Sequence, residues 1–176
     1  MIRVLEKYDK ILDSSYKTVK KELQKLVGDN RRVLLRINDI LSKVHEILLR
    51  PRLYHIILIY HEDKDQLVIY RLSSTHVVKA RKYVDIILNV KVTGEVEAKV
   101  IDDEVADAIR EGYVRKTVIG RNFFECTCEA YRYRGYCSDM VLALILYLYI
   151  NSLRGRKISL EELPVTQMIL DVIREA

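Results

Sequence analysis

Apolar residues recur at helical spacing along the first fifty positions of the chain. Leu5, Tyr8, Leu12, Tyr16, Val19, Leu23 and Leu26 follow one another at steps of three or four residues. This period places them on one face of a helix. Gly28 suits the residue that follows a helix, and Asp29 or Asn30 can cap the next one.

A second apolar stripe follows at the same spacing and ends before Pro51. It consists of Leu34, Ile37, Leu41, Val44 and Leu48. We therefore expect a helical hairpin over residues 1–50. Its apolar face packs within the chain, or it forms the coiled-coil seam of a homo-oligomer.

The middle of the chain is rich in Ile, Val and Tyr between polar turns, which is typical of strands. A short helix is expected over residues 102–111, because its first turn is acidic, and Gly112 is expected to end it. Residues 51–120 are thus predicted to form an antiparallel β region with one short helix. The expected strands cover residues 53–60, 67–72, 84–92, 96–101, 114–119 and 122–126, with a turn at Thr93-Gly94 between the middle two.

The longest apolar run, Met140 to Ile150, spans eleven residues. It is too short to cross a bilayer and suits a buried core helix. After a basic loop at 152–157, a closing helix is expected from Leu160 to the end, interrupted at Pro164. The fold class is therefore predicted to be α+β. Residues 121–153 and 154–176 would complete one integrated domain with the hairpin and the β region.

Composition and charge indicate the kind of organism, the compartment and the possible ligands of the protein. Lys, Arg and Glu are abundant and Gln occurs three times, as is typical of archaeal and other thermophile proteins. The first residues, MIRVLEKYDK, lack the apolar core of a secretory signal, so a cytoplasmic protein without a membrane segment is expected. The net charge is +5, and residues 1–50 alone carry an excess of five basic residues. That excess either contacts nucleic-acid phosphates or forms an ordinary solvated helix face.

Three cysteines lie close together at Cys126, Cys128 and Cys137. In a reducing compartment such a cluster indicates a metal site rather than a set of disulfides. Two cysteines at a strand end and a third at a helix start can surround one Zn²⁺ ion from different sides. Small buried apolar side chains are the alternative role for these cysteines.

This pattern resembles the SWIM-type zinc finger, which carries Cys-x-Cys, a spacer and Cys-x-His, followed by an apolar helix. The resemblance covers about 25 residues, or about 60 when the preceding strands are counted. It implies that Cys126, Cys128 and Cys137 are zinc ligands. The family's histidine is Asp139 here. Asp139 is an oxygen ligand, the N-cap of the helix from Met140, or the mark of a finger that has kept its fold and lost its metal.

The segment between the cysteines, Tyr131-Arg132-Tyr133-Arg134-Gly135-Tyr136, interleaves aromatic and basic side chains. Such a loop can contact phosphates and stack on bases, anchor a protein partner, or pack over the metal site. No Gly-rich phosphate loop, Gly-x-Ser-x-Gly or His-Glu-x-x-His motif occurs in the chain. We therefore expect binding rather than catalysis.

The resemblance also implies a function, because SWIM proteins act in nucleic-acid transactions. Small stand-alone members include mediator subunits of Shu-type complexes, which partner recombinase paralogues in DNA recombination and repair. By this resemblance the protein is a DNA-associated adaptor that partners a RadA-like recombinase paralogue. The alternatives are a protein-interaction or oligomerisation module with a structural finger, and an accessory domain of a mobile-element enzyme.

Overall fold

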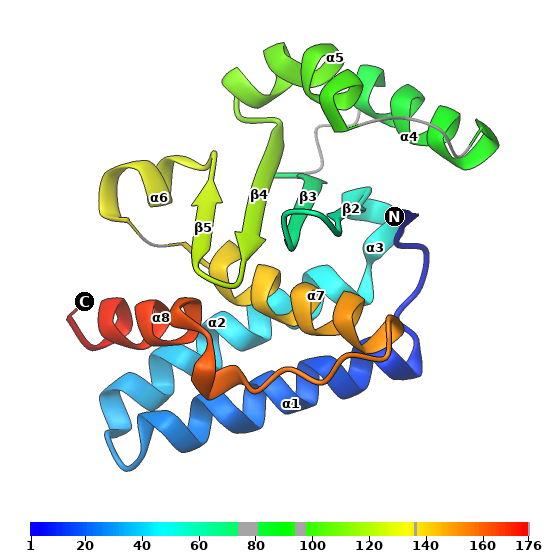
Figure 1. Cartoon of the computed structure of the whole chain (residues 1–176). Coiled ribbons are helices and arrows are strands. Elements are labelled where there is room, and N and C mark those ends of the chain that lie inside the picture. Colours follow the sequence, from blue (N-terminus) through cyan, green and yellow to red (C-terminus); the bar gives the residue numbers. More distant parts are fainter. Residues whose placement is uncertain (74–80, 94–97, 136, 176) are drawn as a thin grey trace.

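The computed structural model describes residues 1–73, 81–93, 98–135 and 137–175. It has the α+β architecture expected from the sequence. One antiparallel five-stranded sheet, in the order β1-β2-β3-β4-β5, lies between two sets of helices (Figure 1). The strands are β1 (Ile2–Val4), β2 (Ile57–His61), β3 (Gln66–Leu72), β4 (Val114–Gly120) and β5 (Phe123–Cys126).

One face of the sheet is covered by α7 (Asp139–Leu153), the apolar helix expected from the sequence. In Figure 1, α7 lies between the sheet and the pair formed by α1 (Lys10–Val27) and α2 (Arg31–Leu49). Every residue from Asp139 to Asn151 is buried. A helix surrounded by protein on all sides needs no polar face, which explains its uninterrupted apolar run.

The helical hairpin is confirmed, and polar side chains cap both arms. Asp9 accepts the backbone N–H of Leu12 at the start of α1, and Asn30 accepts that of Val33 at the start of α2. Between them, Gly28 has a φ of 69°. The two apolar stripes are buried in the chain's own core together with α7.

The sequence did not predict β1, which is only three residues long and pairs with β2 at the edge of the sheet. The structure also shortens the first expected hairpin. Residues 51–54 form a short helix, α3 (Pro51–Tyr54), and the strand begins at Ile57.

The strands expected at 84–92 and 96–101 are wrong. Residues 84–92 belong to α4 (Arg81–Thr93) and residues 98–101 to α5 (Ala98–Arg110), and these two helices cover the second face of the sheet (Figure 1). Residues 96 and 97 lie outside the described residues. The β-branched run favours a strand locally, but burial at Tyr83, Ile86, Ile87 and Val90 follows helical steps against the sheet. Tertiary packing has therefore overridden local propensity. Gly94, in the expected turn, lies outside the described residues.

The expected helix at 102–111 is the second part of α5, and Gly112 follows it with a φ of 81°. The hairpin of β4 and β5 is also confirmed, with Gly120 opposite Phe123. A Cβ at Gly120 would lie 3.1 Å from the carbonyl oxygen of Asp65, so this position favours glycine.

The C-terminal segment ends in a 3₁₀ turn, η1 (Leu160–Glu162), and α8 (Pro164–Glu175). Pro164 begins the final helix rather than interrupting it, because the first helical position does not need a backbone N–H. Among the described residues, no helix is both long and apolar enough to cross a membrane.

Candidate metal centre

Three cysteine sulfurs and one carboxylate converge between β5 and α7. Cys126 is the last residue of β5, and Cys128 is the N-cap of a short helix, α6 (Glu129–Arg134). Cys137 precedes α7, and Asp139 is its first residue. One candidate ligand atom from each residue lies within 4.8 Å of all the others. The predicted ligands therefore meet at one point.

The separations suit a single tetrahedral ion. Zinc–sulfur bonds of about 2.3 Å and zinc–oxygen bonds of about 2.0–2.2 Å place a sulfur and an oxygen of one tetrahedron about 3.5–3.7 Å apart. The Sγ atom of Cys126 lies 3.8 Å from Oδ2 of Asp139. Cys128, Cys137 and Asp139 are buried, and Cys126 is partly buried. Thiolate and carboxylate donors of this kind fit Zn²⁺.

Residues 129–134, between the second and third cysteines, are helical, although they were expected to form a loop. Cys128 accepts the backbone N–H of Tyr131 through its sulfur, at 3.4 Å. Gly135 ends the helix with a φ of 69°, and its N–H donates to the carbonyl of Tyr131 at 2.7 Å. This turn brings the chain back so that Cys137 reaches the other two cysteines.

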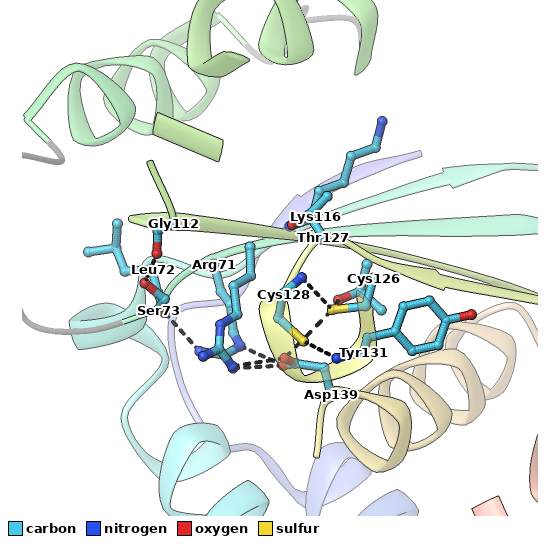
Figure 2. A network of polar contacts seen from close by, with 12 residues as sticks. Arg71, Leu72, Ser73, Gly112, Lys116, Cys126, Thr127, Cys128, Tyr131 and Asp139 are labelled. Carbon is cyan, nitrogen blue, oxygen red and sulfur yellow. Dashed lines mark hydrogen bonds and ion pairs between the residues drawn. The ribbon is translucent and has the colours of Figure 1, made fainter. Parts of the chain in front are cut away.

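Two arginines hold the carboxylate of Asp139, and Figure 2 shows the contact with Arg71. Arg71, from β3, donates to Oδ1 through Nε at 2.9 Å and approaches it through Nη2 at 2.7 Å. Arg115, from β4, donates to Oδ2 at 3.1 Å. The N-cap of α7 is Ser138, without a side-chain hydrogen bond, so Asp139 does not act as the cap.

The two guanidinium groups balance the charge of a filled site. Three thiolates and one carboxylate carry four negative charges, of which Zn²⁺ offsets two and Arg71 and Arg115 the other two. The side chains of Arg71 and Asp139 are only 4% and 1% exposed. Because buried charges need partners, this near-neutral arrangement fits the ion.

The three sulfurs share protons unequally. The pKa of Cys128 lies well below that of an ordinary thiol. The main cause is a hydrogen bond that Cys126 donates to its sulfur, and a second hydrogen bond from Cys137 adds to the effect. Hydrogen bonding to Cys128 raises the pKa of Cys126 to about 12. The cluster therefore favours one thiolate, which is the form that binds metal.

Backbone and hydroxyl groups fix the first cysteine pair. The N–H of Cys128 points at the sulfur of Cys126 at 3.5 Å, and the hydroxyl of Thr117 lies 3.8 Å from the same sulfur. Thr127, between the two cysteines, exchanges hydrogen bonds of 3.1 and 3.0 Å with Lys116 on β4 (Figure 2). These contacts attach the Cys-x-Cys segment to the sheet.

Sequence reasoning missed Arg71 and Arg115 as parts of this site. One signal was available: Arg71 interrupts the apolar strand over residues 67–72. A charged residue at a buried strand position requires an opposite charge nearby. That requirement predicts a buried carboxylate, though not which one.

The predicted aromatic and basic contact residues lie in different environments. Tyr131 is partly buried; its ring meets that of Phe124 edge to face at 5.2 Å, and its hydroxyl donates to the carbonyl of Phe124 at 3.1 Å. Arg132, Tyr133 and Arg134 are exposed, and Tyr133 is 81% accessible. Tyr131 thus packs beside the metal centre, whereas the other three are free to meet a ligand.

The remaining predicted contact residue, Tyr136, lies outside the described residues.

Comparison with protein-family models, curated proteins and solved structures found no match to this chain. The metal centre therefore rests on its own geometry and chemistry.

Proposed function

We propose that the protein is a non-enzymatic, DNA-associated adaptor built around one structural zinc ion. The observation that carries the zinc proposal is the convergence of Cys126, Cys128, Cys137 and Asp139. Four protein ligands close a tetrahedral site and leave no position for a substrate. A closed site supports a structural role for the metal.

In this proposal the ion fastens the α6 segment to the sheet and to α7. None of the residues of α6 is buried, and a six-residue helix is too short to be stable alone. The metal would therefore hold Arg132, Tyr133 and Arg134 in a fixed place on the surface. The resemblance to SWIM fingers supports DNA as the ligand and a RadA-like recombinase paralogue as the protein partner.

Metal analysis of the purified protein beside an Asp139→His variant tests the zinc proposal. We expect one equivalent of zinc in both, because either side chain can complete a tetrahedron with three thiolates. Asp171→His, on the surface of α8, serves as the control for adding a histidine. A parent without zinc beside a variant with one equivalent would show that the native finger is degenerate.

Salt-dependent binding tests the DNA proposal. The affinity for DNA is expected to fall steeply as salt rises, because binding releases counterions from the phosphates. Arg132→Ala and Arg134→Ala separate the contributions of the two exposed arginines of α6. A protein that does not bind DNA even at low salt would contradict this part of the proposal.

A protein-interaction module is the second candidate, and one exposed residue favours it. Leu35, on α2, is 67% accessible although the apolar stripes of the hairpin are buried. A homo-oligomer formed through the hairpin would use this outer face. Sedimentation of the protein and of Leu35→Asp tests it, since a monomeric parent excludes the oligomer.

A further inference from the structure

A groove runs between α2 and α6 beside the metal centre. It encloses about 370 Å³. Cys137 and Ser138 line it next to the candidate zinc site, so an ion there would fix the spacing of its two walls. Its other main lining residues are Arg36 and Lys43 from α2, and Ala130 and Arg134 from α6.

The groove carries a surplus of positive charge. Arg36, Lys43 and Arg134 line it, and Asp39 is the acidic residue among its lining. Asp39 lies 3.3 Å from Lys43 in an exposed ion pair, which is weak in water. Arg36 donates to the carbonyl of Ile173 at 2.9 Å, a neutral acceptor that leaves its charge uncompensated. Arg134 forms no ion pair with another described residue.

A larger cavity of about 490 Å³ on the other side of α6 lacks this surplus. Two of its three arginines pair with acids, since Arg110 pairs with Asp107 and Arg115 pairs with Asp139; Arg132 is the third. Glu111 and Glu129 also line it. A polyanion is therefore attracted more strongly to the groove between α2 and α6.

Helix geometry assigns the residues of α6 to different sides. Arg134 follows Ala130 by four residues, so both face α2, whereas Arg132 points about 160° away from Arg134 at 100° per residue. Tyr133 points about 100° from each of these two arginines. It does not line the groove, but it is next to Arg134 in the chain and is 81% exposed. An exposed tyrosine ring that adjoins a phosphate-binding arginine in the chain provides a stacking surface for an unpaired base.

We propose that this groove binds the backbone of single-stranded DNA, with Arg36, Lys43 and Arg134 contacting phosphates and Tyr133 stacking on a base. The inference rests on the proposed DNA-associated function and locates it. The two arginines of α6 therefore have different roles: Arg134 contacts the DNA strand, and Arg132 does not.

Fluorescence anisotropy with a labelled oligothymidylate, at about 50 and 200 mM salt, tests the groove. The double variant Lys43→Glu/Arg134→Glu is expected to bind at least about ten-fold more weakly and to show a shallower salt dependence, because two phosphate contacts are lost. Arg52→Glu/Lys157→Glu makes the same change of charge at exposed sites that do not line the groove, and is expected to bind within about two-fold of the parent. Circular dichroism and zinc content confirm that each variant is folded.

Tyr133→Ala gives an independent measure of stacking. We expect about ten-fold weaker binding to the single strand and little change for a duplex of the same length, whose bases are already stacked. If Tyr133→Ala binds single-stranded DNA as tightly as the parent, Tyr133 does not stack on a base.

If the groove variant and the control variant lose affinity equally, the groove is not the binding site, although the protein still binds DNA. A parent that binds neither DNA form at low salt would instead overturn the proposed function.

Discussion

Asp139 occupies a position at which metal binding and charge balance meet. Its Oδ2 atom lies 3.8 Å from the sulfur of Cys126 and 3.1 Å from Nη1 of Arg115. Arg71 contacts the other oxygen. A histidine could replace the carboxylate as a ligand, but it could not neutralise two arginines. The aspartate is therefore suited to this chain in a way that the motif alone does not reveal.

Asp139→Asn removes the negative charge of the side chain and keeps its shape, so it measures how much the charge contributes to stability. The change leaves the buried guanidinium of Arg71 without its anion, so the free energy of unfolding should fall by about 3–5 kcal/mol. Urea denaturation with a chelator present in every sample measures this loss apart from zinc binding. Asp39→Asn breaks an exposed pair with Lys43 and should cost less than about 1 kcal/mol. Similar losses in the two variants would contradict the charge balance.

The sequence predicts the ligands better than their surroundings. Cys126, Cys128 and Cys137 lie within twelve residues, so short-range spacing was enough to bring them together. The Arg71–Asp139 contact joins positions 68 residues apart, and it depends on how the fold places the end of β3 beside the start of α7. Local patterns contain no information on such a pairing.

At the level of elements, the sequence predicts helices and strands correctly where the apolar residues follow one clear spacing. It fails where a strand preference and a helical spacing occur in the same segment. The arms of the hairpin and the β4–β5 turn follow clear helical and alternating patterns, and the structure confirms both. Residues 84–92 combine β-branched side chains with helical spacing. The outer face of the sheet, with Ile57, Val68 and Tyr70, is buried by α4 and α5, and this contact selects the helix.

Helix α6 lies beside the candidate metal centre, and in the proposed function the ion holds it in place. It buries none of its residues, and its ends are fixed through Cys128 and Gly135. If the proposed zinc ion is bound, removing it with a chelator should raise hydrogen-exchange rates at least about ten-fold over residues 129–134, while β2 and β3 keep their protection. Hydrogen exchange read by mass spectrometry measures both regions in one sample, and returning zinc should restore α6. An equal rise in exchange across the sheet would contradict this local role.

At the level of the whole molecule, α7 connects the two halves of the larger core. It packs against β4 and β5 on one side and against α1, α2 and α8 on the other. The same core contains buried residues from the hairpin, the sheet, the metal segment and the C-terminal helix. The N-terminal hairpin and the C-terminal helix α8 are thus stabilised through the same central helix.

A cavity in α7 should therefore weaken the sheet and the helical layer together. Leu146 is fully buried, and Leu146→Ala should lower the free energy of unfolding by about 2–5 kcal/mol, because it removes apolar contacts and leaves a void. Far-ultraviolet circular dichroism follows the helices and tyrosine near-ultraviolet signals follow the packed core, so their urea transitions should shift by the same amount and remain coincident. Leu35→Ala removes the same atoms from a side chain that is 67% exposed and should change stability by less than about 0.5 kcal/mol. Two separate transitions in the variant would show that the sheet and the hairpin unfold as independent units, contrary to the central position of α7.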